Sequence, residues 1–230
     1  MAIADIGKTN KKGDETRDKI KAVGRELFSR YGIDLVTTRD IAKAANQKSV
    51  GSVNYYFRSK DDLILEILAD AAWEHDKLQM QWLDRLEAEG AEIGLRDILK
   101  VLTLPDSPEA EEHIRLFAML NIYRRDLMQT VFPKRWDKAY HRCLAYLETQ
   151  LDYYDKKLLR QRMYFLIPYL WTLLATRHRP EHQNFQFWAH LWSNPVSIEN
   201  LLDTAEGLLR QPPSEETLTA MARQGQEGGA

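Results

Sequence analysis

The sequence has little of several features that mark other classes of protein. Its 230 residues include a single cysteine, Cys143, so no disulfide can form within the chain. A reducing compartment, the cytoplasm, is therefore expected. The longest apolar run, residues 164–175, falls short of the roughly 18 residues that a membrane-spanning helix needs. The first residues carry no apolar signal run, so we expect neither secretion nor a membrane partner.

The signatures of enzymes and of metal or nucleotide sites are missing as well. We find no nucleophile elbow, no glycine-rich phosphate loop and no His-Glu-x-x-His pattern. His178 and His182 are four residues apart, but Pro180 lies between them and breaks the helix that would align them. The sequence therefore predicts no catalytic residue, no metal and no cofactor, and we expect that the protein is not an enzyme.

What the sequence has in abundance is helical periodicity. Apolar residues make up 44% of the chain, enough for a core, and no strand-like alternation or internal repeat appears. An all-α fold follows. Capping residues, glycines and prolines divide the pattern into expected helices at about 14–31, 60–87, 95–104, 107–123, 132–151, 156–176, 185–192 and 195–211. Pro168 is expected to kink or divide the helix that contains it.

Charge is distributed unevenly along the chain. Residues 1–60 hold 13 Lys and Arg against 7 Asp and Glu, whereas the remainder holds 19 against 27, for a net charge of −2 overall. A basic first quarter on an acidic body is typical of a DNA-binding head attached to a body that does not bind DNA. Chance clustering would give the same split, so charge alone leaves both interpretations open.

The stretch from Thr37 to Leu65 contains three helix starts in quick succession. Thr37 and Asp40 form a capping-box pattern before the first short helix, and residues 46–49 make a polar turn. A second short helix follows over residues 50–57, and Ser59 then caps a third helix. Two short helices joined by a turn of about four residues indicate a helix-turn-helix, whose second helix enters the major groove of DNA.

These residues also resemble a known family. GSVNYYFRSKDDL, from Gly51 to Leu63, resembles the end of the DNA-binding domain of the TetR family, and TTRDIAKAA, from Thr37 to Ala45, resembles the helix before it. The resemblance covers about residues 19–68 and implies an all-helical second domain without a shared sequence. The chain departs from the family pattern at the turn, where Asn46 stands in place of the usual glycine. Asn tolerates a left-handed backbone, so the turn is expected to survive.

The helix-turn-helix predicts a set of DNA-contacting residues. The first residues of its second helix are expected to reach base edges, and the resemblance implies that the first tyrosine of the triplet, Tyr55, meets a phosphate. Lys60, at the start of the third helix, is expected to bind a phosphate with help from the helix dipole. The predicted contacts are Thr37, Thr38, Arg39, Lys43, Lys48, Ser49, Gly51, Ser52, Asn54, Tyr55, Tyr56 and Lys60.

The whole chain is expected to form four segments. These are a flexible basic arm (1–13), the helix-turn-helix domain (14–60), a helical regulatory and dimerisation domain (61–211) and a disordered tail (212–230). The aromatic side chains of the body could simply form its core, but the resemblance to the TetR family implies a ligand cavity. The candidate lining residues are Tyr123, Trp136, Tyr140, Met163 and Trp171. Apolar stripes on two late helices suggest a two-fold dimer interface made of Ile167, Leu170, Leu174, Ile198, Leu201, Leu202, Ala205 and Leu209.

Two functions remain open at this point. The first is a homodimeric repressor that binds operator DNA and is released from it by a small-molecule effector. The second is a DNA-bound interaction protein that a protein partner controls, with no small-molecule ligand. A closed cavity in the body would favour the first, and a large exposed apolar patch away from the dimer face would favour the second.

Overall fold

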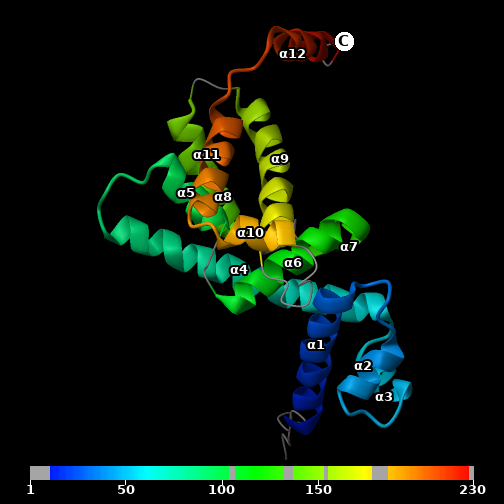
Figure 1. Ribbon diagram of the computed structural model, residues 1–230. Helices are drawn as coiled ribbons and strands as arrows, with labels where there is room; N and C mark the ends of the chain where they lie inside the picture. Colours follow the sequence, from blue (N-terminus) through cyan, green and yellow to red (C-terminus); the bar gives the residue numbers. More distant parts are fainter. Residues whose placement is uncertain (1–10, 104–106, 132–136, 153–154, 178–185, 228–230) are drawn as a thin grey trace, which may run out of the picture.

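The structure is a computed structural model that describes residues 11–103, 107–131, 137–152, 155–177 and 186–227. Every regular element in these residues is a helix, as the sequence predicts (Figure 1). The helices are α1 (Lys11–Tyr31), α2 (Thr38–Ala44), α3 (Val50–Tyr56), α4 (Lys60–Ala88), α5 (Leu95–Thr103), α6 (Pro108–Tyr123), α7 (Arg125–Val131), α8 (Lys138–Gln150), α9 (Lys156–Leu174), α10 (Gln186–Ser193), α11 (Val196–Arg210) and α12 (Glu215–Glu227).

The first three helices form a small head with its own core. Ile20 and Phe28 of α1 pack with Ile41 of α2 and Val53 of α3, and all four side chains are fully or almost fully buried. The chain leaves α1 at Gly32, whose φ of 85° lies in the left-handed region, and whose N–H donates to the Phe28 carbonyl at 2.9 Å. This is the glycine-terminated helix end that the sequence predicts.

Helix α4 joins the head to the body (Figure 1). The Ser59 hydroxyl accepts a hydrogen bond from the Asp62 N–H at 3.0 Å and caps its start. Its 29 residues extend over about 44 Å at 1.5 Å per residue. Side chains of its first half, such as Leu63 and Ile67, belong to the head core, whereas Leu83 belongs to the body core. The same rigid element is therefore part of both cores.

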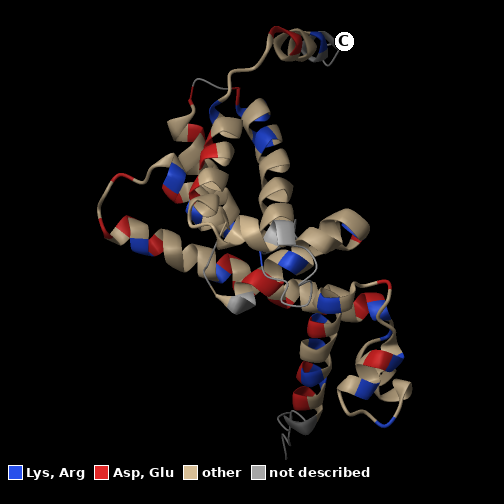
Figure 2. Ribbon diagram, in the orientation of Figure 1, with Lys and Arg blue, Asp and Glu red and all other residues tan. Residues whose placement is uncertain are grey.

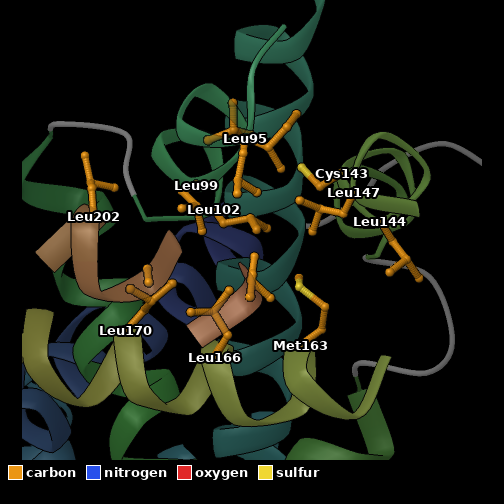
Figure 3. Close-up of a cluster of buried hydrophobic side chains, with 14 of the residues drawn as sticks. Leu95, Leu99, Leu102, Cys143, Leu144, Leu147, Met163, Leu166, Leu170 and Leu202 are labelled. Carbon is orange, nitrogen blue, oxygen red and sulfur yellow. The ribbon is translucent and has the colours of Figure 1, made fainter. Parts of the chain in front are cut away.

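The body core consists mainly of leucine side chains from α5, α8, α9 and α11, which converge on one another (Figure 3). Two polar side chains of α4 enter this region and find backbone partners there. Asp76 accepts a hydrogen bond from the Ala139 N–H at 2.8 Å, and the Gln79 amide donates to the Val101 carbonyl at 3.1 Å. These bonds fix α4 against the start of α8 and the end of α5, because leaving such buried groups unbonded is costly.

Helices α6 and α7 lie between the two cores. Phe117 of α6 is fully buried in the head-side core, and its ring centroid lies 5.2 Å from that of Trp171 on α9. Arg124, directly after α6, donates to both carboxylate oxygens of Asp61 in the first turn of α4, at 2.8 Å each. This bidentate pair lowers the pKa of the Asp61 carboxyl. The core of the head therefore extends beyond residue 60, because side chains of α6 and α7 belong to it.

The structure corrects several expectations about element boundaries. Residues 215–227 form α12, where the sequence suggested a disordered tail. Lys11–Gly13 belong to α1 rather than to a flexible arm, and residues 1–10 lie outside the described residues. Helix α9 is continuous through Pro168, so the proline does not divide it. The short α7 was not predicted, because the preceding pattern ends at Tyr123 and the break consists of one residue, Arg124.

Candidate nucleic-acid interface

Local side-chain bonds set the start of α2. The Thr37 hydroxyl accepts a hydrogen bond from the Asp40 N–H at 3.2 Å, and the Asp40 carboxylate accepts one from the Thr37 N–H at 2.9 Å. The predicted capping box is therefore confirmed. Hydrogen bonds from the Thr37 side chain and backbone lower the pKa of the Asp40 carboxyl. The Thr37 hydroxyl also donates to Asp40 at 2.6 Å. The Thr37 side chain therefore stabilises the start of α2.

The turn between α2 and α3 depends on Asn46. Its φ of 55° is the left-handed conformation expected of a residue that stands in place of glycine. The Gln47 N–H then donates back to the Ala42 carbonyl at 2.8 Å and closes the turn. Ser49 follows as the N-cap of α3, and its side chain makes no capping hydrogen bond. The turn therefore sets the angle of α3 through the backbone, and the exposed Lys48 and Ser49 stand at its start.

Burial separates the inner face of α2 and α3 from the outer one. Ala42, Ala45 and Phe57 are buried in the head core. Tyr55 is 81% exposed and stands edge-on to Tyr56, with ring centroids 5.1 Å apart. The structure thus brings the predicted residues of α2 and α3 onto one accessible surface, which we call the α2–α3 face. Its exposed members are Arg39, Lys43, Lys48, Ser49, Gly51, Asn54 and Tyr55, and its half-buried members are Thr38, Ser52 and Tyr56.

The cations of the head fall into two groups. Three cations of α1 are paired with acidic side chains: Arg17 with Glu66, Lys21 with Asp70 at 2.7 Å, and Arg25 with Glu112 at 3.4 Å. Acidic and basic positions alternate along α1 (Figure 2). The cations beside the α2–α3 face, which are Arg39, Lys43, Lys48 and Arg58, are exposed to solvent. Positive charge therefore remains available to a polyanion on that face, whereas three of the cations of α1 are neutralised by acidic neighbours.

Two residues near the start of α4 differ from expectation. Arg58 was not among the predicted contacts, yet it is exposed in the link between α3 and α4. Because Arg58 directly follows Phe57 of the motif, its position in the sequence could have identified it as a candidate DNA contact. Lys60 is half-buried, and its ammonium group donates to the Ile33 carbonyl at 2.5 Å and lies 5.9 Å from the Phe28 ring centroid. To bind a phosphate, Lys60 would have to exchange this internal bond for an external one.

The residues predicted for a ligand pocket do not gather in one place. Tyr123 is 68% exposed at the end of α6, and Tyr140 is half-buried on α8. Met163 is fully buried in the body core, Trp171 lies between the two cores, and Trp136 falls outside the described residues. Sequence periodicity places such side chains on helices, but it does not show which helices meet.

Six of the residues predicted for the dimer interface belong to the core of the protomer itself. Leu170, Leu174, Leu201, Leu202, Ala205 and Leu209 are buried, and Ile167 and Ile198 are half-buried against the same core (Figure 3). The stripes are apolar because α9 and α11 pack on each other and on α5. A contact between copies through α9 would therefore use its outer face, where Tyr164 is 73% and Phe165 60% exposed.

In the residues that the structure describes, no three or more His, Cys, Asp or Glu side chains gather as metal ligands would. None of the helices in the described part of the chain has the length and apolar character that a membrane span requires. The α2–α3 face is thus the surface on which the sequence motif and the exposed cations coincide.

The comparison with known proteins agrees with this geometry. The family model for bacterial regulatory proteins of the tetR family matches residues 20–67, which run from α1 into α4. The HTH-type transcriptional regulator QacR of Staphylococcus aureus is 41% identical over 66 residues, covering 29% of this chain and 33% of QacR. The HTH-type transcriptional regulator AcrR of Shigella flexneri is 29% identical over 127 residues, covering 55% of this chain and 53% of AcrR. The chain thus matches about half or less of these relatives.

Among solved structures, a putative tetR family transcription regulator from Shewanella sp. PV-4 has the same fold. It aligns with 84% of this chain and 95% of its own, with a TM-score of 0.54 and 12% identity. An exposed basic helix-turn-helix on an all-helical body defines a class of DNA-binding transcriptional regulators. Residues 20–67 match the DNA-binding domain of the tetR family, in agreement with the resemblance predicted over residues 19–68.

Proposed function

We propose that this protein is a homodimeric repressor whose α2–α3 face binds operator DNA and whose body binds a small-molecule effector that releases it. The observation that supports DNA binding most strongly is the division of the head's cations. Arg17, Lys21 and Arg25 of α1 are held by acidic partners, whereas the cations Arg39, Lys43, Lys48 and Arg58 are exposed around the helix-turn-helix. Phosphate contacts from such cations supply affinity, and side chains at the start of α3 supply sequence preference.

Capture of genomic fragments tests this proposal even though the operator sequence is unknown. Purified protein is incubated with sheared DNA, and the retained fragments are sequenced. A sequence motif with two related half-sites, about one helical turn apart or a multiple of it, is expected for a two-fold regulator. A variant with Lys48→Ala and Tyr55→Ala should retain far fewer fragments. Uniform retention of all sequences by both proteins would count against operator recognition.

Homodimerisation is proposed through the outer face of α9 rather than through its buried stripe. Tyr164 and Phe165 are exposed there, and Pro168 is half-buried beside them. A two-fold axis at this face would bring the same residues of two copies together, as isologous contacts require. Phe165→Glu should then give folded monomers in sedimentation velocity, while Lys77→Glu, at an exposed position on α4, should leave the dimer intact. A wild-type chain that is monomeric at micromolar concentration would contradict the proposal.

The effector site is proposed where α4, α6 and α9 meet. Trp171 lies against Phe117, and the ring of His75 on α4 lies edge-on to Phe117 with centroids 5.4 Å apart. Burial lowers the pKa of His75 to about 3, with a further contribution from His113, so the imidazole is neutral at pH 7. Its Nδ1 atom is buried without a hydrogen-bond partner in the described residues. A neutral polar atom among aromatic rings suits an apolar ligand that carries one hydrogen-bonding group.

A ligand at this position would act on the connection between body and head. Helix α4 belongs to both cores, and the Arg124–Asp61 pair ties the end of α6 to its first turn. An effector that binds better to one tilt of α4 shifts the population of head spacings. Coupling of about 1–3 kcal/mol would weaken DNA binding roughly 5- to 150-fold.

Reciprocal binding measurements test this switch. Compounds that raise the thermal unfolding temperature are first selected, and their affinity is then measured by calorimetry with and without the captured operator. Linkage requires that operator lower the affinity for the effector by the same factor by which the effector lowers affinity for operator. A compound that binds free and DNA-bound protein equally is not an inducer, and control by a protein partner would then be the better account.

A further inference from the structure

Helix α12 extends from the end of the body, which it contacts through Met221. It follows α11 after a short exposed link and projects beyond the end of the body (Figure 1). Among its residues with described side chains, 215–223, only Thr217 and Met221 are half-buried, and Met221 packs against the body core. Leu218, one turn before Met221 on the same side of the helix, is 52% exposed. One face of α12 is therefore apolar and largely uncovered.

A helix of this length needs a surface to pack against. Isolated helices shorter than about 12–15 residues are marginal in water even when their composition is favourable, and most helical stability comes from packing of an amphipathic face. The 13 residues of α12 begin with local caps, since the Ser214 hydroxyl accepts from the Thr217 N–H at 3.4 Å and lowers the pKa of Glu216. Caps start a helix but do not cover Leu218.

The link between α11 and α12 directs the chain away from its own body. Pro212 and Pro213 occupy the middle of this link. Each proline fixes its own φ, and the first is followed by another, so the link is stiff and extended. Such a link limits how far α12 can fold back onto its own body, which it meets through Met221. Leu218 stays exposed and is free to be covered by another molecule.

The first turns of α9 offer a complementary surface at the same end of the body (Figure 1). Arg160 and Lys156 share a single carboxylate, that of Glu148, at 3.0 and 3.2 Å, so this face keeps a positive charge. Helix α12 begins with Glu215 and Glu216 and continues with its apolar face. Acidic and apolar positions on α12 thus match basic and aromatic positions on α9. The exposed side chains on the outer face of these first turns are Lys157, Arg160, Gln161 and Tyr164.

We propose that α12 of one protomer crosses the two-fold axis and packs on the outer face of the first turns of α9 in a second copy of the chain. This inference rests on the homodimer of the proposed function and adds a reciprocal exchange of C-terminal helices to it. The α9 face that receives α12 is continuous with Phe165, so both contacts form one surface. The exchanged helix would stabilise the dimer and would leave the core of each protomer unchanged.

Cysteine cross-linking tests the exchange directly. The native Cys143 gives little background, because it is fully buried and burial raises the pKa of its thiol to about 12. Chains carrying Leu218→Cys are mixed with chains carrying Gln161→Cys, allowed to exchange subunits, and oxidised mildly. A covalent dimer of the two chains is expected, at least about fivefold more abundant than with Ala220→Cys, which lies on the opposite side of α12.

Truncation separates failure of this inference from failure of the dimer itself. A chain ending at Gln211 should stay folded, since α12 contributes only Met221 to the core, and its dimer dissociation constant should rise at least tenfold. A full-length monomer would contradict both proposals. A full-length dimer with unchanged dissociation constant after truncation and no interchain cross-link would overturn the exchange alone. A cross-link formed only within a doubly substituted chain would also overturn it, by placing α12 on its own α9.

Discussion

The head and the body of this protein are both built from amphipathic helices, but their functional surfaces are encoded differently. In the head, Thr37, Asn46 and Ser59 each fix an element through bonds to neighbouring backbone, so sequence order alone sets the α2–α3 face. In the body, α9 has apolar residues on its inner and its outer face, and packing decides which side is buried. A motif can therefore reveal the candidate DNA-binding surface, whereas the proposed interface between copies depends on the tertiary structure.

The largest expected effect is a loss of stability on substitution at the buried face of α11. It distinguishes the buried faces of α9 and α11 from their exposed faces. Leu202→Glu would place an unpaired charge in the protomer core, where Leu202 is only 2% exposed. We expect a loss of about 3–5 kcal/mol in the free energy of unfolding, enough to unfold much of the population. Urea titrations followed by circular dichroism would measure it.

Phe165→Glu serves as the matched comparison, because it adds the same charge to an exposed position on α9. Its monomer should unfold within about 1 kcal/mol of the wild-type monomer. A folded, stable monomer from Leu202→Glu would instead restore the buried stripe as the interface and would contradict the assignment of that stripe to the core.

The next effect concerns the buried histidine at the junction of the two regions. The folded state holds the pKa of His75 at about 3, against 6.5 for a histidine free in water, chiefly through burial. Between these values the unfolded chain binds a proton that the folded chain does not, so stability falls as pH decreases from about 6.5. His75→Phe should remove up to about 2 kcal/mol of the stability loss between pH 7 and pH 5.

Urea midpoints at the two pH values measure this loss. The substitution His190→Phe, at an exposed position, is the control and should leave the pH dependence unchanged. An equal acid-induced loss in wild type and His75→Phe would show that His75 is not the neutral buried group at the junction.

These comparisons show how far the sequence predicts the fold. Helix ends with a local chemical signal were predicted closely: Gly32 ends α1, Ser59 starts α4, and Ser107 with Pro108 starts α6. Elements without such a signal were not. Helix α12 follows two prolines and is rich in Gln and Gly near its end, a composition typical of disorder. Pro168 stays within α9, because its neighbours in the core hold the helix together on both sides.

The candidate sites differ in the same way, because some have a local signal in the sequence and others depend on tertiary packing. The predicted residues of α2 and α3 are exposed or half-buried, because local signals fix both short helices and the turn between them. Lys60 was predicted to bind a phosphate, but it donates to the Ile33 carbonyl, a bond that depends on the path of a loop 27 residues earlier. The pocket residues were chosen by side-chain type, and type does not specify which of two cores a tryptophan such as Trp171 joins.

A smaller effect is expected at the turn between α2 and α3. It tests whether the backbone conformation of Asn46 stabilises the head. Asn46 adopts a φ of 55°, which a residue with a plain Cβ adopts at a cost of about 1 kcal/mol. Asn46→Ala should therefore lower the unfolding free energy by about 1 kcal/mol, whereas Asn46→Gly should be close to neutral. Thermal unfolding of the two variants in parallel would measure the difference. If Ala and Gly behave alike, the left-handed turn is not what holds α2 against α3.

The salt dependence of DNA binding tests the central claim most directly. Affinity for a captured operator fragment is measured from low to moderate salt for wild type, for Lys43→Ala on the α2–α3 face, and for Lys77→Ala on the exposed side of α4. Each phosphate contact releases about one counterion, so Lys43→Ala should flatten the slope of log affinity against log salt by about one ion per subunit. Lys77→Ala should leave the slope unchanged. Identical slopes for wild type and Lys43→Ala, or a flatter slope for Lys77→Ala alone, would contradict DNA binding through the α2–α3 face.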